Sequence, residues 1–266
     1  MKTEKKQIGL AELKKIQLDM LIDVADFCAK NQISYFLAYG TLIGAIRHKG
    51  YIPWDDDIDI CMPRPDYDKF LKLYNNKKSP YRVVDFSINN SYKLPFAKVN
   101  DTRTIIWETM YDKDVFGIYL DVFPIDGCDK TGKIIKRSMR LGQFLNAKKA
   151  ILGNSRTFKK NVIIAIGKCF LAFVSVKKLL LKMKELTKEI PYEKAEYVAN
   201  IMYSYGDCEI MRKEELEETV SKEFEGHIFK VPKAYDQYLR QIYDDYMKLP
   251  PIEKRVSTHT FEAWWR

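Results

Sequence analysis

The run WDDDIDI at residues 54–60 constrains the fold of this chain more than any other feature of its sequence. It places four carboxylates within five residues. Because side chains alternate along a β-strand, Asp57 and Asp59 would share one face. Ile58 and Ile60 would then point the other way, into a core. The run therefore predicts a strand with one apolar side and one acidic side.

Carboxylates a few ångströms apart repel one another, and they stay ionised near neutral pH only if a cation neutralises them. Oxygen ligands favour a hard ion, so Asp57 and Asp59 are candidate ligands for Mg²⁺ or Mn²⁺. Magnesium usually completes its shell with substrate phosphate, which predicts a phosphorylated substrate. The alternative is an acidic surface loop, and the framing by Trp54 and alternating isoleucines argues against it.

A third carboxylate, Asp121, lies between Leu120 and Val122 in the apolar segment IYLDVFPID. A lone Asp in such a strand is costly unless it is paired or bound to a metal, so Asp121 is a third candidate ligand. An edge-strand Asp that faces solvent is the alternative. Asp126, in the sequence PIDG, is predicted to be a turn residue.

Gly40 and Thr41 stand where a predicted strand gives way to a predicted helix. Backbone N–H groups at a helix start can hold a phosphate, and Thr41 could both cap the helix and bind a phosphate oxygen. Arg47 and His48 follow and could balance the charge of a pyrophosphate. His48 is also a candidate general base, although an isolated histidine is more often structural.

The hydrophobic pattern along the chain predicts an α+β fold, with a mixed sheet flanked by helices. Helices are predicted over 9–31, 41–50, 64–76 and 234–247, and strands over 33–40, 57–62, 81–86, 94–100, 104–111, 117–125 and 224–232. We expect a catalytic core at 1–127, a basic helical region at 128–190, and an α-rich region at 191–266 that packs back on the core.

The formal net charge of +9 is concentrated in one segment. Residues 127–190 contain 16 Lys and Arg against 3 Asp and Glu, whereas the remainder of the chain is slightly acidic. Within this segment the apolar stretch 162–176 is too short to span a bilayer and is bracketed by lysines. This pattern is typical of a helix that lies on an anionic membrane surface. A buried helix with outward lysines is the alternative.

The five cysteines are scattered and show no C-x-x-C pair, which argues against a disulfide framework or a zinc knuckle. The first fifteen residues are polar where a signal peptide would need an apolar stretch. We therefore expect a cytoplasmic protein, associated peripherally with the inner face of the membrane. No nucleic-acid-binding signature accompanies the basic segment, and no nucleic-acid partner is expected.

The ordered set of h-G-T, D-h-D-h and h-D-h resembles the polymerase-β-like nucleotidyltransferase superfamily. The segments YFLAYGTLIGAIRHKGYIPWDDDIDI and YLDVFPIDG are similar to those of the LicD family in particular. VPKAYDQYL and YMKLPP echo the family's C-terminal pattern. The resemblance is strong over 33–127 and weak in the basic middle, and this chain has Gly-Thr where the wider superfamily has Gly-Ser.

The resemblance implies a nucleotidyltransferase fold and transfer of phosphocholine, or a related polyol phosphate, from a CDP-linked donor to a lipid-linked glycan acceptor. Fukutin-related ribitol-phosphate transferases share the motif. The resemblance to the LicD family also implies that Asp57, Asp59 and Asp121 hold the metal. Asp121 or Asp55 would take the proton of the attacking sugar hydroxyl. The resemblance does not determine which alcohol phosphate is transferred.

A choline group would need aromatic faces around its quaternary ammonium. Trp54, Trp107, Tyr39 and Tyr92 are candidates, and core packing is the alternative for each. Two other functions also stay open. One is a nucleotidyltransferase that moves NMP from an NTP with the same carboxylates, and the other is a non-catalytic binding protein that uses the basic segment.

Overall fold

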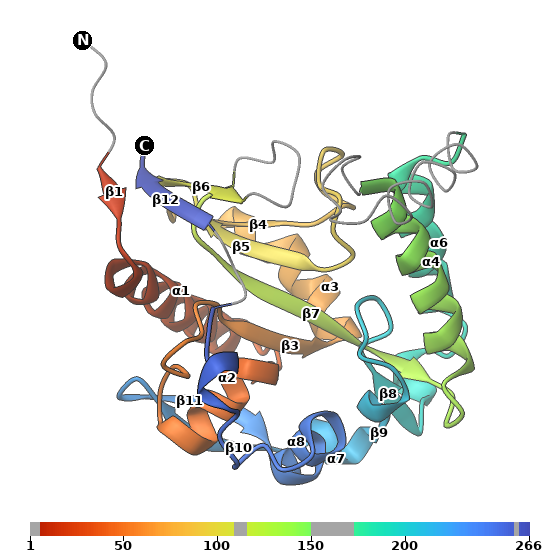
Figure 1. The fold of residues 1–266 in the computed structure, drawn as a ribbon. Helices are drawn as coiled ribbons and strands as arrows, with labels where there is room; N and C mark the ends of the chain where they lie inside the picture. Colours follow the sequence, from red (N-terminus) through yellow and green to blue (C-terminus); the bar gives the residue numbers. More distant parts are fainter. Residues whose placement is uncertain (1–5, 109–115, 150–172, 258–260) are drawn as a thin grey trace.

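The computed structural model describes residues 6–108, 116–149, 173–257 and 261–266. A mixed sheet runs through the centre of the molecule (Figure 1). Its order is β2 (Phe36–Leu37), β3 (Asp59–Pro63), β7 (Tyr119–Cys128), β5 (Ala97–Asp101) and β4 (Tyr81–Val84). β3 and β7 are parallel, and the other neighbours in this order are antiparallel. The predicted α+β class is confirmed.

The strand β7 is the central strand, and all ten of its residues are buried. The helices α1 (Leu10–Asn31) and α3 (Arg64–Leu73) pack against it. β8 (Tyr197–Ala199) extends the sheet along the last residues of β7, and β9 (Met211–Arg212) pairs with β8. A polar side chain in β7 therefore needs a partner inside the protein.

Asp126 lies within this buried strand, so its prediction as a turn residue was wrong. Its carboxylate accepts hydrogen bonds from Arg64 Nε at 2.6 Å and Arg64 Nη2 at 3.0 Å. The strand continues through Gly127 to Cys128 because β8 supplies its hydrogen-bonding partner. The PIDG pattern could not reveal that partner, which comes from about seventy residues further along the chain.

The predicted 33–40 strand and 41–50 helix have different boundaries in the structure. β2 covers only two residues, and α2 (Tyr39–Ile43) starts two residues earlier than predicted. Tyr39 adopts the left-handed φ of 46°, which turns the chain abruptly from strand to helix. α2 continues into a π-helical turn over Gly44–His48. A Cβ on Gly44 would lie 2.5 Å from the Gly50 carbonyl oxygen, so only glycine allows this close return.

The C-terminal part of the chain packs on the N-terminal part in two places. β12 (Phe261–Trp265) lies between β1 (Gln7–Ile8) and β6 (Thr104–Glu108), which brings the two ends of the chain side by side (Figure 1). β10 (Thr219–Phe224) and β11 (His227–Pro232) form a hairpin where one strand was predicted. The hairpin arises because Glu225 and Gly226 both take positive φ.

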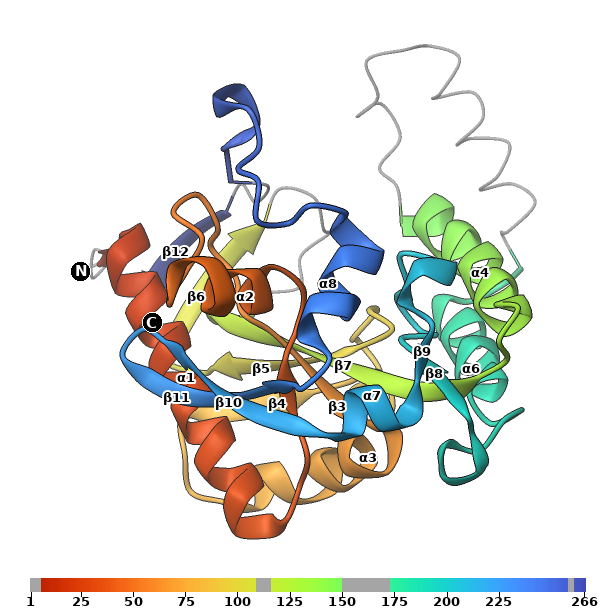
Figure 2. The same ribbon diagram turned by 90° about the horizontal axis from the view of Figure 1, so that it is seen from below.

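Two short helices and several single turns complete this region. The helices are α7 (Lys213–Glu217) and α8 (Tyr235–Tyr243), and α8 is shorter than the predicted 234–247. Single 3-10 turns occupy Tyr192–Lys194, Asp207–Glu209 and Ile252–Lys254, and another, Tyr74–Asn76, follows α3. Seen from below, α8 and α2 lie close to the hairpin of β10 and β11 (Figure 2).

The basic segment forms a helical pair in its described part. α4 (Lys133–Lys149) and α6 (Val176–Leu186) pack side by side beyond the end of β7 (Figures 1 and 2). Leu179, Leu180 and Met183 of α6 are buried together with Leu145 of α4. α6 is thus an amphipathic helix whose apolar face packs on the protein. Most of the apolar stretch 162–176 lies outside the described residues.

Within the described part of the chain, no helix is both long and apolar enough to cross a bilayer.

Candidate functional site

The predicted carboxylates meet where β3 begins. Asp59 is the first residue of β3, and it stands directly opposite Asp121 of β7 in the parallel register. Asp57 precedes the strand by two residues, and Ile58 and Ile60 are fully buried on the other side of the backbone. Adjacent strands lie about 4.8 Å apart, so the tertiary fold brings together two carboxylates that are far apart in sequence.

Lys98 is the cation of this acidic edge, and sequence reasoning missed it. It lies on β5 opposite Asp121, and its Nζ donates to Asp121 Oδ1 at 2.6 Å. Both side chains are largely buried. The signal was present in the segment LPFAKVN, because a lone lysine in an apolar strand is as costly as a lone aspartate. Buried lysines of this kind are almost always paired.

The electrostatics of the edge favour a bound cation. Burial raises the pKa of Asp59 well above its ordinary value, and the charges of Asp57 and Asp121 raise it further. Asp55 acts in the same direction, and Lys98 acts in the opposite one. Among the described residues that act on this pKa, Lys98 opposes three carboxylates, and a further positive charge would stabilise the ionised form of Asp59.

The loop before β3 holds a second arrangement of carboxylates. Asp55, Asp56 and Asp57 each have an oxygen within 4.8 Å of the others, which suits a metal ion. Asp56 is buried and accepts from Ser257 Oγ at 2.5 Å, while Gln17 of α1 donates to the Asp56 carbonyl at 3.0 Å. The loop is therefore held from both ends of the chain. Asp57 belongs to this group and also adjoins Asp59.

Gly40 and Thr41 both contact the acidic loop or the start of β3. Thr41 lies inside α2 rather than at its N-cap, and its hydroxyl accepts from the Asp59 backbone N–H at 2.8 Å. It therefore fixes the start of β3. A Cβ on Gly40 would lie 2.7 Å from Asp55 Oδ2, so glycine allows the acidic loop to approach the helix. The turn supports the carboxylates directly.

A basic and aromatic group lies beside the acidic loop. Arg47 Nε donates to His48 Nε2 at 2.9 Å, and Arg47 Nη1 donates to the Tyr246 carbonyl. The His48 ring is 6.4 Å from that of Trp54, and the guanidinium carbon of Arg255 lies 5.6 Å from the Trp54 ring. Arg255 comes from the C-terminal segment and was not predicted.

His48 is poorly placed to act as a general base, because its Nε2 already accepts from Arg47. Burial and the Arg47 charge lower the pKa of His48, which keeps the ring neutral at neutral pH. Burial lowers the pKa of Arg47, and the nearby Arg255 charge lowers it further. Two guanidinium groups that repel each other favour an anionic ligand between them.

The four aromatic candidates occupy different environments. Tyr39 is 4% exposed and bonds Asn200 and Glu209 through its hydroxyl. Tyr92 is buried in the apolar cluster that α4 and α6 help to form. Trp107 lies on β6 against Trp264, in the separate three-stranded sheet. Of the four, only Trp54 is partly exposed beside the acidic loop.

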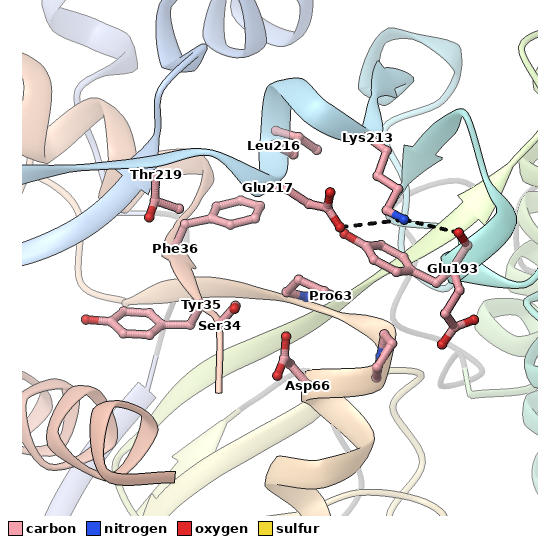
Figure 3. A pocket seen from close by; sticks show the side chains of 12 residues that line it. Ser34, Tyr35, Phe36, Pro63, Asp66, Glu193, Lys213, Leu216, Glu217 and Thr219 are labelled. Carbon is pink, nitrogen blue, oxygen red and sulfur yellow. Dashed lines mark hydrogen bonds and ion pairs between the residues drawn. The ribbon is translucent and has the colours of Figure 1, made fainter. Parts of the chain in front are cut away.

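A separate cavity of about 400 Å³ lies at the other end of β3 (Figure 3). Its lining includes Pro63 of β3, together with Lys213 and Glu217 of α7. Lys213 Nζ lies 3.7 Å from Glu217 Oε1 and donates to the Glu193 carbonyl at 3.4 Å. Because Asp59 and Pro63 stand at opposite ends of β3, the cavity is roughly 13 Å from the acidic edge. It lies outside the candidate site.

Comparison with known proteins agrees with this architecture. Residues 32–144 match the family model described as LicD/FKTN/FKRP, nucleotidyltransferase domain. The chain is 32% identical to the lipopolysaccharide cholinephosphotransferase LicD of Haemophilus influenzae, over 97% of this chain and 99% of the relative. An uncharacterized protein of Rickettsia typhi is 38% identical over 125 residues, which cover 47% of this chain and 36% of that protein. The matched family segment contains every candidate carboxylate and Lys98. Together with the similarity over nearly the whole chain, this match shows that the chain is an enzyme, a transferase that belongs to the LicD family.

Proposed function

We propose that this transferase moves phosphocholine from CDP-choline to a sugar hydroxyl of a cell-surface glycan precursor. The observation that carries the proposal is the alignment with a lipopolysaccharide cholinephosphotransferase over nearly the whole of both chains. The juxtaposition of Asp59, Asp121 and Lys98 supports it, since charge would develop on phosphate oxygens at this edge.

Mg²⁺ or Mn²⁺ fits the residues of this edge. Asp57, Asp59 and Asp121 would hold the ion, and they offer only oxygen ligands, which suit a hard cation. When bound, such an ion supplies Lewis acidity that offsets negative charge on a diphosphate. Asp55 and Asp56 approach Asp57 closely enough to share in the binding.

The chain's own residues would orient the reactants. The acceptor hydroxyl oxygen forms a bond to the phosphorus that carries choline, the bond from that phosphorus to the bridging oxygen breaks, and CMP leaves. Lys98 donates to Asp121 Oδ1, so that oxygen is already engaged by a cation. We therefore assign to Asp55 the role of accepting the hydroxyl proton. Arg47 and Arg255 would bind the donor's diphosphate.

Donor and metal dependence are tested together. The purified protein is incubated with CDP-choline, CDP-ribitol or CDP-glycerol and a lipid-linked glycan extract, and CMP release and glycan labelling are measured. We expect CDP-choline to be consumed, activity to vanish in EDTA, and Mg²⁺ or Mn²⁺ but not Zn²⁺ to restore it. Full activity in chelator would contradict the metal assignment. Consumption of NTPs alone, with release of pyrophosphate, would show a nucleotidyltransferase instead.

We also propose that the protein works at an anionic membrane surface, where a lipid-linked acceptor would be met. The excess of lysine and arginine in 127–190 supports this, as does the 98% exposure of Phe173. In liposome flotation, the protein should bind anionic vesicles at low salt and be released as salt rises. Replacement of Phe170, Leu171 and Phe173 by Ser should abolish binding. A wild-type chain that stays in the aqueous fraction would contradict the proposal.

A further inference from the structure

An aromatic cluster shares one face of the sheet with the acidic edge. Phe123 lies two residues after Asp121 on β7, so both side chains point to the same face. Phe96 joins this surface, because the Nζ of Lys98 lies 5.5 Å from its ring centroid. The rings of Phe96 and Phe123 are 4.5 Å apart and form the floor of the cluster.

The loop after β8 places Tyr203 on this floor and Tyr205 against Tyr39. The Tyr203 ring lies 4.9 Å from that of Phe96 and stacks on Phe123 at 6.0 Å, with an interplanar angle of 19°. The Tyr205 ring lies 5.5 Å from that of Tyr39. It also lies 6.1 Å from the ring of Tyr243, which comes from α8.

The two tyrosines differ from the rest of the cluster in their exposure. Tyr203 is 52% exposed and Tyr205 is 60% exposed, whereas Phe96, Phe123 and Tyr39 are all at most 5% exposed. Exposed aromatic faces next to a charged edge are available to a ligand. Large aromatic residues would otherwise bury more of their surface.

The loop holds these rings in fixed positions. Asn200 donates from Nδ2 to the Tyr203 carbonyl at 2.8 Å and accepts from the Tyr203 N–H at 2.9 Å. The Tyr205 N–H donates to Glu209 Oε1 at 2.8 Å, and Glu209 is buried. A preorganised loop loses little entropy when a ligand binds, which suits a recognition surface.

The aromatic faces beside the acidic edge select the kind of ligand. Burial raises the pKa of the Tyr203 phenol, and the charges of Asp121 and Asp59 raise it further. The Tyr203 ring therefore lies within electrostatic range of the edge that would hold the metal and the donor's diphosphate. Aromatic faces bind cations that shed their water easily, and quaternary ammonium groups are the leading example.

We propose that Tyr203 and Tyr205, completed by Tyr243, receive the quaternary ammonium of the donor and so determine which CDP-linked alcohol this enzyme uses. This inference rests on the proposed function. It assigns donor selectivity to a segment far from the carboxylates in sequence. Tyr203 and Tyr205 thereby replace Tyr92 and Trp107 as the aromatic residues that would contact choline.

Calorimetric binding tests the inference without turnover. CDP-choline is titrated into the protein with Mg²⁺ and no acceptor, alongside the carbon isostere in which 3,3-dimethylbutanol replaces choline. The two compounds have the same shape and differ in charge. We expect the wild type to prefer CDP-choline by about 10-fold, in line with a partly desolvated cation–π contact. A Tyr203→Leu/Tyr205→Leu variant should bind both compounds equally.

Two controls separate this role from a structural one. Tyr203→Phe and Tyr205→Phe keep the aromatic face and should keep the preference. Tyr197→Leu changes a tyrosine on the adjacent β8 whose ring faces Lys130 and Arg212, and it should also keep the preference. Each single Leu variant should lose part of the preference for CDP-choline, so the prediction can still be tested if the double variant misfolds.

The inference is overturned if the double Leu variant retains the wild-type preference, or if the wild type binds the two compounds equally or does not bind CDP-choline. Failure of the proposed function looks different. In that case the wild type would discriminate between the two compounds in calorimetry but would transfer no phosphocholine to any glycan.

Discussion

Replacing Asp59 by Asn should lower the transfer rate by about 10³-fold or more while the protein stays folded. The carboxylate stands opposite Asp121 at the start of β3, where it would neutralise and orient the metal. Asn keeps the shape of the side chain but removes the negative charge that a cation needs. The measurement is CMP release from CDP-choline with saturating Mg²⁺. Asp26→Asn, at an exposed position of α1, is the matched control and should be fully active.

The same variant should be more stable than the wild type in chelator, by an amount that depends on pH. Burial and neighbouring carboxylates raise the pKa of Asp59, so the folded protein holds its proton more tightly than the unfolded chain does. The contribution of Asp59 to wild-type stability therefore falls as pH rises above about 4, the usual aspartate value. The Asp59→Asn variant lacks this loss of stability. The amount by which its Tm exceeds that of the wild type should therefore grow toward neutral pH and shrink when Mg²⁺ is added. Wild-type activity, or a lower Tm at pH 7 in chelator, would contradict the assignment.

Replacing Lys98 by Met should lower the free energy of unfolding by about 3 kcal/mol, because it removes the hydrogen-bonded ammonium from the buried Asp121 carboxylate. Transfer should also decline, since Asp121 loses the hydrogen bond that positions it. Urea denaturation measures the first effect and CMP release the second. Lys230→Met is the matched control, because it changes an exposed strand lysine of the β10–β11 hairpin.

A double-mutant cycle shows whether the loss of the Lys98–Asp121 pair causes the loss of stability. Lys98→Met combined with Asp121→Asn removes both charges, so the double variant should be more stable than Lys98→Met alone. Additive losses would mean that Lys98 acts through packing rather than through Asp121. A Lys98→Met protein as stable and as active as the wild type would remove Lys98 from the site altogether.

Local pattern was sufficient for several elements. The three- and four-residue spacing of Leu13, Ile16, Met20 and Val24 predicted a helix, and α1 buries these residues. The alternation around Asp59 predicted β3 to within two residues at its start. Both are amphipathic elements whose periodicity reports directly on the face that will be buried. The family resemblance, confirmed by comparison, added the enzyme class.

Local pattern failed where a distant segment supplied the deciding contact. Asp126 was assigned to a turn because its salt bridge with Arg64 and its pairing with β8 are not visible in the surrounding residues. The apolar face of α6 is covered by α4, which the spacing of residues within α6 does not show. In each case the neighbouring sequence describes the polarity of a surface but not what covers it.

The carboxylate motif by itself determined where a cation site would be sought, because four like charges beside buried isoleucines demand neutralisation. Only the tertiary structure decided what surrounds that motif. Strand register places Lys98 against Asp121, the loop after β8 places Tyr203 over Phe123, and the C-terminal segment brings Arg255 to Trp54. These contacts join residues between 23 and 201 positions apart. Their formation depends on sheet pairing and burial across the whole fold, which no local periodicity encodes.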